Sequence, residues 1–416
     1  MSTLIKIAFR NLWKNSRRSF FTIAAIALGY AAVNVFGGFT AYIFTSLKDA
    51  YVYAQGNGHL TIFKKGFLAN DSQDPFNYLL GEEDVLIVKQ VVKDIPDVVL
   101  VSGQLNISGL LSNGRVSTVF VAAGRVPSAI RDIRSRAPGM IGKIKLFEGK
   151  QLEDDIAHGI GLSTGLANKL DLTFGSDAIA MAPTVQGQIN ALDAQVFQMF
   201  KAPNEAIENQ LMIVPLKFAQ TLYDTGGVDR LTVLLDDTEK TEKVRVSLTQ
   251  KLAQRGMKVE VKTWREIATF YDRTKGMFDI IFLFIFIIVF VIVVMSVINT
   301  ISMAVMERIR EIGTFRALGI KRRSIVMLFA IESAMLGLFG SALGVCITIL
   351  SWVAFRIIEP TWIPPQMARE VPLEVHLVPD YVAMTMLFLV VLSILAAIMP
   401  ARKAARMNIV DALGHV

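Results

Sequence analysis

The chain has little charge and almost no cysteine. Of its 416 residues only 19% are charged, whereas 53% are hydrophobic; a typical soluble protein has roughly a quarter of its residues charged. This composition excludes an ordinary soluble protein. The only cysteine, Cys346, excludes a disulfide framework. Four histidines are present without the spacing of a metal site, so we predict no metal ion: His59, His158, His376 and His415.

Several catalytic motifs are also missing. The sequence has no G-x-x-x-x-G-K-[ST] phosphate loop and no G-x-S-x-G nucleophile motif. We therefore predict a protein that is not an enzyme, with no catalytic residue and no bound cofactor. Glu332 is the sole acid within a long apolar run, which argues against a proton or sodium relay. Two interpretations of Glu332 remain open: a role in coupling, or a carboxylate that snorkels or pairs with Arg322 or Arg323.

Long hydrophobic runs are plentiful. A helix needs roughly 20 apolar residues to cross a bilayer, and four segments meet that length. The first is about twice as long as a signal-peptide core, so we expect a retained anchor. We predict four transmembrane α-helices at 19–47, 277–306, 324–355 and 381–401.

Lys and Arg cluster beside these spans and indicate their orientation. The leader 1–18 carries five cations and no acid, and the connector 307–323 and the tail 402–416 are also net basic. Such segments remain on the cytoplasmic side. We therefore predict a multi-pass protein of the cell inner membrane with both termini in the cytoplasm. These segments together exceed the formal net charge of +7, so the excess is topological and we predict no nucleic-acid partner.

The segment 48–276 has ordinary polar composition, and its length suffices for a core of its own. We predict a large α+β extracytoplasmic (periplasmic) domain inserted between helices 1 and 2. Asn113-Gly114 predicts a tight hairpin turn between strands at 105–111 and 116–122. Residues 131–210 are rich in Gly, Pro, Asp and Gln and predict a looser second lobe.

Further elements complete this prediction. Strands at 211–214, 230–235 and 258–262, with helices at 215–222 and 238–254, predict a small αβ sandwich. Five prolines in the outer loop 356–380 exclude a continuous helix there.

Two segments predict helical stalks that extend the first two spans outward. Trp264 to Lys275 has helical spacing without a breaker, and Leu47 to Tyr53 is its counterpart on the first span. Such stalks would couple the outer domain to the membrane helices. The alternative is an interfacial belt, in which their aromatic residues lie at headgroup level.

The connector 307–323 has the most distinctive pattern. Ile309, Ile312 and Phe315 fall three apart on one helical face, and Gly313 and Gly319 permit close backbone approach or a turn. The pattern alone favours equally a helix that lies on lipid and a helix that binds a partner.

Three motifs resemble those of one family. These are IAFRNLWKNSRRS at 7–19, MERIREIGTFRALGIKRRSI with ESAMLGLFGSALG at 306–325 and 332–344, and PARKAARMNIVDAL at 400–413. In this order they resemble the leader, coupling segment, third span and tail of FtsX-like, MacB-type ABC transporter permeases. The layout is most similar to that of the lipoprotein-releasing permeases LolC and LolE. The outer domain matches more loosely, for instance at IGLSTGLANKLDL, 160–172.

The resemblance implies a permease that works with two separate ABC ATPase subunits, which bind the ATP-Mg, and with a second permease, identical or paralogous. It implies mechanotransmission, in which ATP-driven closure moves the outer domain through the spans. It also implies a possible periplasmic acceptor or adaptor beside the lipid bilayer. The implied ATPase-coupling residues are Glu307, Arg308, Arg310, Glu311, Gly313, Phe315, Arg316, Ala317, Leu318 and Gly319.

The leading hypothesis is release of a lipoprotein or other amphiphilic substrate from the inner membrane toward the periplasm. Three alternatives remain: MacB-like tripartite efflux of peptides or drugs, FtsX-like regulation of a periplasmic hydrolase, and a membrane receptor. Candidate substrate-facing residues lie at the outer ends of the first two spans: Phe36, Phe39, Tyr42, Phe44, Met277, Phe278 and Ile281.

Overall fold

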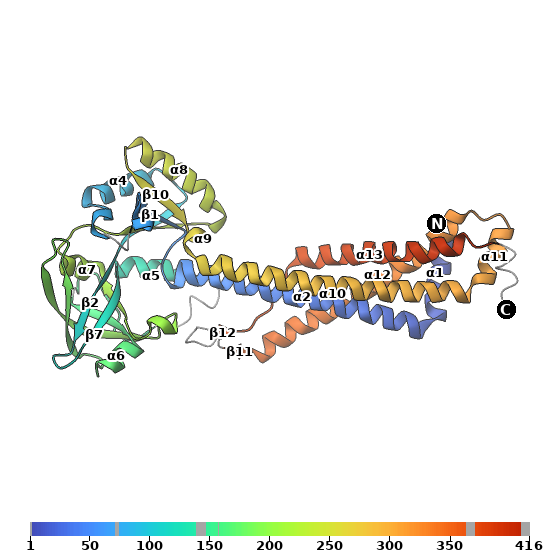
Figure 1. Cartoon of the computed structure of the whole chain (residues 1–416), viewed down its shortest axis with the longest axis horizontal. Helices are drawn as coiled ribbons and strands as arrows, with labels where there is room; N and C mark the ends of the chain where they lie inside the picture. The colour runs from blue at the N-terminus through green and yellow to red at the C-terminus, as the bar shows by residue number, and fades with distance from the viewer. Residues whose placement is uncertain (1, 71–74, 139–146, 157, 363–370, 409–416) are drawn as a thin grey trace. The chain divides into compact units, whose positions relative to one another are not determined.

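The chain folds into two compact units in a computed structural model, which describes residues 2–70, 75–138, 147–156, 158–362 and 371–408 (Figure 1). The helical unit comprises Met1–Phe44, Thr274–Thr361 and Pro372–Val416, and the β-rich unit comprises Thr45–Arg273 and Trp362–Val371. Each unit is described by itself below.

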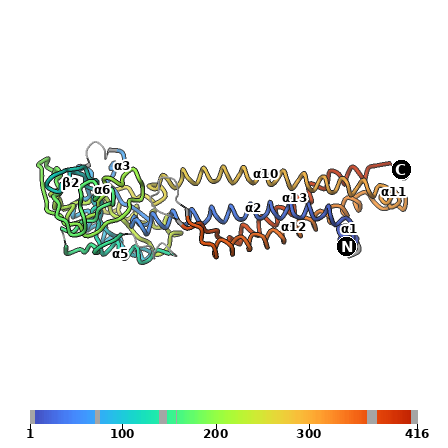
Figure 2. Tube along the Cα trace, turned by 90° about the horizontal axis from the view of Figure 1, so that it is seen from below, coloured from blue at the N-terminus to red at the C-terminus, as the bar shows by residue number. Residues whose placement is uncertain are grey.

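Helices form the first unit. Within the described residues, four of them are long and apolar enough to cross a membrane: α2 with its outer extension, α10, α12 and α13. α12 and α13 lie side by side in both views (Figures 1 and 2). With a β-rich α+β domain between the first and second long helices, the predicted fold class is confirmed. The helices are α1 (Ser2–Lys14), α2 (Ser16–Asp49), α10 (Thr269–Glu307), α11 (Ile309–Ala317), α12 (Arg322–Ile358) and α13 (Pro379–Ala405).

Backbone breaks define the short helix α11. Arg308 leaves the helical region, with φ −118° and ψ 19°, and separates α10 from α11. Gly319 follows the last turn with a positive φ of 88°. A glycine in this position is the usual end of a helix, because it has no Cβ to oppose the left-handed conformation.

A ten-stranded sheet organises the β-rich unit. Its order is β10-β1-β9-β2-β3-β8-β5-β7-β4, and β6 pairs with β2 and β7. The predicted hairpin is confirmed as β2 and β3, and Gly114 in its turn has a φ of 86°. The strands are β1 (Leu60–Lys64), β2 (Val98–Ser112), β3 (Ser117–Arg125), β4 (Glu148–Gly149), β5 (Gly159–Ser163), β6 (Asp177–Pro183), β7 (Ile189–Phe200), β8 (Leu211–Pro215), β9 (Arg230–Leu235) and β10 (Val259–Thr263).

Two hydrophobic cores divide this unit differently from the sequence-based prediction. Residues of β8 and of α7 (Leu216–Tyr223) belong to the core that also contains β2, β3, β5, β6 and β7. A second core joins β1, β9 and β10 to α4 (Glu82–Lys93) and α8 (Thr241–Gln254). The predicted single αβ sandwich therefore groups β8 and α7 with the wrong strands.

Within residues 131–210, the described part is ordered structure rather than a loose lobe. It contains α6 (Thr164–Lys169), β5, β6 and β7, and β5 is buried along its whole length. On β6 buried and exposed residues alternate, as expected for a strand with one face on a core. Part of the composition that suggested looseness lies inside the strands themselves, for instance Gly159 and Gly161 in β5 and Gln195 and Gln198 in β7.

The predicted stalk at 264–275 is not one continuous helix. α9 (Trp264–Ile267) begins with a capping box between Thr263 and Glu266, and Ala268 then leaves the helical region before α10 begins. On the other side, α2 is followed by a π-helix at Ala50–Ala54. Both segments are helical, but each has an irregular turn at the β-rich unit.

Candidate coupling site

The short helix α11 buries one narrow face. Ile309 and Ile312 are 3% and 7% exposed, and Gly313 is buried with them. Phe315, in contrast, is 38% exposed. The buried stripe of α11 therefore runs through Ile309, Ile312 and Gly313, whereas Phe315 is partly exposed.

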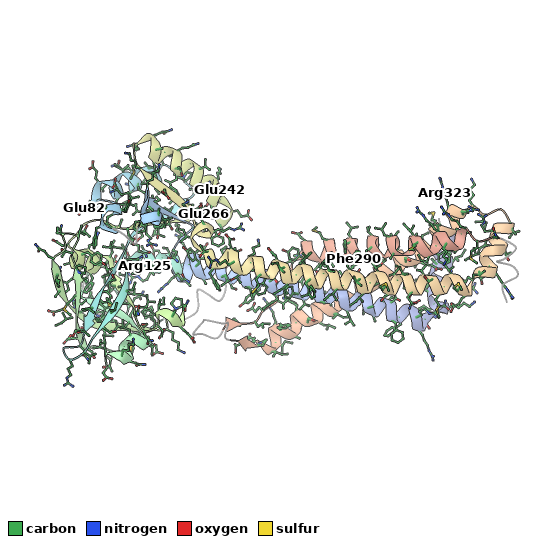
Figure 3. The ribbon with its side chains drawn as sticks, in the orientation of Figure 1. Glu82, Arg125, Glu242, Glu266, Phe290 and Arg323 are labelled. Carbon is green, nitrogen blue, oxygen red and sulfur yellow. The ribbon has the colours of Figure 1, made fainter. Side chains whose placement is uncertain are left out.

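The outer side of α11 combines apolar and charged residues. Leu318 is 75% exposed and Ile320 40%, and Arg310 and Glu311, which come earlier on α11, are exposed as well. We call Arg310, Glu311, Phe315, Leu318 and Ile320 the α11 surface. Exposed cations continue from it into α12, among them Arg323 (Figure 3). This surface is suited to an apolar recess with an acidic rim.

Glu332 has different partners from those predicted. It is 2% exposed, and its Oε1 accepts hydrogen bonds from Asn11 Nδ2 at 2.6 Å and from Arg308 Nη1 at 2.9 Å. The predicted pairing with Arg322 or Arg323, and snorkelling to the surface, are both wrong. Arg322 and Arg323 are exposed at the start of α12, whereas Glu332 lies against α1 and the break before α11.

Glu307 also has partners within the chain. Its carboxylate pairs with Arg18 Nη1 at 3.0 Å and accepts a hydrogen bond from Asn15 Nδ2 at 3.1 Å. Two residues that the resemblance assigned to ATPase coupling, Glu307 and Arg308, are thus held by other helices of the same unit. Arg316 is half-buried and Gly313 buried, which leaves Arg310, Glu311, Phe315, Ala317, Leu318 and Gly319 exposed.

Four of the predicted substrate-facing residues form an aromatic cluster. The ring of Phe278 lies 6.2 Å from that of Phe36, 6.3 Å from Phe39 and 5.7 Å from Phe44, between ring centroids. These distances are typical of aromatic pairs that attract one another. α2 and α10 are therefore in contact in the outer half of the helical unit.

The other three predicted residues lie elsewhere. Tyr42 is buried, donates its hydroxyl to the carbonyl of Pro372 at 2.9 Å and packs against His376. Met277 and Ile281 are 53% and 39% exposed on α10. The structure therefore brings together only four of the seven predicted substrate-facing residues.

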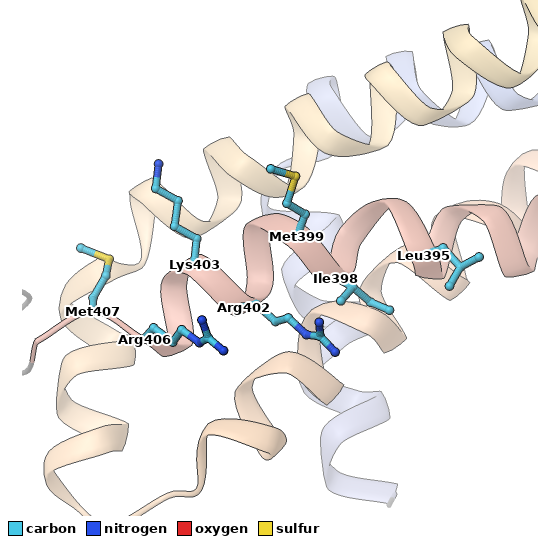
Figure 4. A pocket seen from close by; sticks show the side chains of 7 residues that line it. All are labelled: Leu395, Ile398, Met399, Arg402, Lys403, Arg406 and Met407. Atoms are coloured by element: carbon cyan, nitrogen blue, oxygen red, sulfur yellow. The ribbon is translucent and has the colours of Figure 1, made fainter.

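A shallow hollow of about 760 Å³ lies along the last turns of α13 (Figure 4). Its cations, Arg402, Lys403 and Arg406, belong to the basic tail that indicated a cytoplasmic C-terminus. The sequence does carry a signal for this hollow. The spacing of Leu395, Met399, Arg402 and Arg406 places these residues on one stripe of α13, and all four are exposed. The lining residues are Leu395, Ile398, Met399, Arg402, Lys403, Arg406 and Met407.

In the β-rich unit, one small cluster joins the chain's entry and exit. Val52, next to the end of α2, and Trp264, at the start of α9, are buried together with Ile133 and Leu234. Tyr271 of α10 packs edge-on against Trp264, with ring centroids 4.9 Å apart. We call this set the anchor cluster. Tyr51, Tyr53 and Tyr271 are partly buried and pack against it.

Two arginines cap the outer end of the α2 extension. Arg125 donates to the carbonyl of Gln55 and, at 3.0 Å, to Asn57 Oδ1 (Figure 3). Arg134 donates to the carbonyl of Ala54 at 3.0 Å. Burial, with Arg230 and Arg134 nearby, lowers the pKa of Arg125 to about 10, so it remains charged at neutral pH. Cations favour the carbonyl end of a helix, so this cap stabilises the anchor.

Comparisons with known proteins identify the class. Residues 283–409, which include the third long helix and the connector, match the family model described as FtsX-like permease C-terminal. In this match the chain is similar to ABC transporter permeases of the MacB/FtsX type. An uncharacterized ABC transporter permease of Methanocaldococcus jannaschii is 22% identical over 99% of this chain and 97% of its own length.

Two further relatives match part of the chain. The macrolide export ATP-binding/permease protein MacB of Escherichia coli is 26% identical over 54% of this chain, which corresponds to 34% of MacB. The chain thus matches about a third of that relative's length. The crystal structure of the periplasmic region of MacB from Actinobacillus actinomycetemcomitans covers 52% of this chain and 94% of its own, with a TM-score of 0.38 and 16% identity.

Proposed function

We propose that this permease transmits force from a separate ATPase subunit to its β-rich unit. The observation that carries the proposal is the α11 surface, on which Leu318 is 75% exposed beside charged neighbours. Water makes such exposure unfavourable, whereas a partner that buries Leu318 and Phe315 makes it an anchor of binding. In this arrangement the connector and both termini are cytoplasmic, and the β-rich unit is periplasmic.

The anchor cluster supports mechanical transmission. The entering segment around Val52 and the leaving segment around Trp264 share one core with Ile133 and Leu234. A displacement of either long helix along its axis therefore acts on the β-rich unit at the same place. Two ATPase subunits and a second permease, identical or paralogous, complete the transporter in this proposal.

We propose a lipoprotein or other amphiphilic molecule as the substrate, passed toward a periplasmic acceptor or adaptor. The aromatic cluster around Phe278 supports this choice, because it offers apolar side chains at the outer half of α2 and α10. Acyl chains can bind such a surface without hydrogen bonds. The named activity of MacB, macrolide export, makes efflux the second candidate.

The test is purification of the full chain in mild detergent from cells that express its neighbouring genes. We expect an ATPase to co-purify, and Leu318→Asp to abolish its retention. Ile189→Asp is a matched control, because Ile189 is 84% exposed on β7, remote in sequence from α11. ATP hydrolysis by the isolated chain, or equal retention by both variants, would refute the proposal. For the substrate, photo-crosslinkers at Phe44 and Phe278 should capture a lipidated molecule; capture of a soluble peptide alone would favour efflux.

A further inference from the structure

At the break between α10 and α11, these two helices meet α1, α2 and α12. The two residues at the break, Glu307 and Arg308, have opposite charges and different partners. Glu307 pairs with Arg18 in the first turns of α2, and Arg308 pairs with Glu332 of α12. Both contacts lie within the helical unit.

The leader helix joins these two pairs. Asn11 of α1 donates to Glu332, and Asn15, at the α1–α2 junction, donates to Glu307. The two asparagines are four residues apart, the spacing that places side chains on one face of a helix. One side of the leader therefore contacts both carboxylates, so α1 is part of the same polar junction.

The break between α10 and α11 explains why these two ion pairs matter for the orientation of α11. No side chain caps the first turn of α11, and Arg308 has non-helical torsion angles. The direction of α11 is therefore not determined by a continuous helix. It depends instead on the burial of Ile312 in the helical core and on where the Glu307 carboxylate and the Arg308 guanidinium are held.

Beyond the junction, α2 and α10 remain in contact along their length. Thr22 and Thr300 share a hydrogen bond, and a Cβ on Gly29 would lie 2.7 Å from Val289 Cγ1. Residue numbers rise along α2 as they fall along α10, so the two helices run antiparallel. A force that reaches α10 at Glu307 can thus reach α2 through the Arg18 pair.

We infer that Glu307 and Arg308 are positioning residues that orient α11 and distribute its movement, rather than contacts of the ATPase. Glu307 ties the start of α11 to α2, and Arg308 ties it to α12. This inference rests on the proposed function for its role in transport, but the positioning itself belongs to the permease alone.

The first experiment needs no ATPase. In a Cys346→Ser background, spin labels are placed at Thr314→Cys on α11 and at Phe21→Cys, which is 72% exposed on α2. Pulsed electron paramagnetic resonance on the full chain in nanodiscs measures the distribution of distances between the two labels. We expect a narrow distribution that broadens in Arg18→Glu and in Glu307→Arg, and becomes narrow again when the two changes are combined.

The chain offers a matched control beside the pair. Arg17 is exposed, and Arg17→Glu makes the same charge change one residue away. Its distribution should equal that of the parent. Equal distributions in Arg17→Glu and Arg18→Glu would overturn the inference, as would a combined variant that stays broad. If charge reversal prevents folding, Glu307→Gln removes the charge alone and should still broaden the distribution.

The second experiment uses the permease together with its co-purified ATPase. We expect Arg18→Glu to lower the amount of substrate moved per ATP about two- to fivefold, the range of a partly exposed ion pair. The KM for ATP should not change, because the nucleotide site lies on another subunit. Absence of any ATPase would refute the proposed function and leave the label distances to decide the positioning role.

Discussion

Thr22 of α2 and Thr300 of α10 share a hydrogen bond of 2.5 Å between their hydroxyl oxygens, although 278 residues separate them in the chain. Both side chains are buried, at 3% and 8% exposure. Apolar helices in a bilayer gain little from burial against one another, so a buried hydroxyl pair helps to select the partner and the register. The pair identifies the first and second spans as direct neighbours.

Removal of this pair should weaken the contact between the two helices. We expect Thr22→Val or Thr300→Val alone to cost about 1 kcal/mol of unfolding free energy, because the remaining hydroxyl loses its partner. The double variant should cost less than the sum of the single variants. Reversible unfolding of the full chain in detergent or bicelles measures this cycle, and strictly additive costs would show that the hydroxyls do not interact.

Arg308 should tolerate the removal of its charge partner, Glu332, poorly. Replacement by alanine leaves the Arg308 guanidinium, 12% exposed in its side chain, without its carboxylate. We expect Glu332→Ala to cost about 3–5 kcal/mol, as for other broken buried pairs. The combined Glu332→Leu and Arg308→Met variant should be less destabilised, because neither charge remains. Urea-dependent unfolding measures the free energy of unfolding of both variants. A smaller loss in Glu332→Ala than in the combined variant would contradict the buried pairing.

Two neighbouring glycines of α2 should respond differently to a methyl group. A Cβ on Gly38 would overlap the carbonyl oxygen of His376, whereas on Gly37 it would lie 3.4 Å from Tyr381, an ordinary contact. We expect Gly38→Ala to cost about 1–3 kcal/mol through overpacking. Gly37→Ala should be neutral or stabilising by up to about 1 kcal/mol, because alanine favours helices. Thermal unfolding measures the change in Tm for both variants, and equal changes would refute the close approach of Gly38 to His376.

His59 makes the β-rich unit sensitive to acid. It is fully buried; its Nδ1 accepts from the Leu235 amide at 3.1 Å, and its Nε2 lies 2.9 Å from Thr238 Oγ1. Burial and the charge of Lys48 lower its pKa from 6.5 to about 4. The unfolded chain therefore binds a proton between pH 6.5 and 4 that the folded chain does not.

Stability must consequently fall as the pH is lowered through that window. The His59 contribution is complete above pH 6.5 and decreases by about 2 kcal/mol at pH 5. Hydrogen exchange at the Leu235 amide in the full chain, corrected for intrinsic rates, measures the change. In His59→Gln this pH dependence should disappear; persistence of the same slope would assign it to another group.

Local sequence patterns predicted the parts of this protein whose interactions are local. Apolar runs marked the long helices, and Asn113-Gly114 marked a hairpin because the turn depends on backbone angles at two residues. Burial of Ile309 and Ile312 also followed from helical spacing. The break at Ala268 was not predicted, because no Pro or Gly marks it; the capping box of Thr263 and Glu266 marks only the start of α9.

Long-range pairings could not be predicted in this way. The partner of Glu332 is Asn11, 321 residues away, and nothing near Glu332 distinguishes that partner from Arg322 or Arg323. The assignment of β8 to a different core from β9 likewise depends on parallel pairing with β3. Periodicity indicates which face of an element is buried, but not which distant element covers it.

The pairing of Leu60 with Thr263 in antiparallel register places the first and last strands of the inserted domain next to each other. The two ends of the inserted domain therefore lie next to each other on its surface. A different compact domain with adjacent termini could be grafted at this point without lengthening either connection. Such an exchange would replace the inserted domain and leave the sequences of the long helices unchanged.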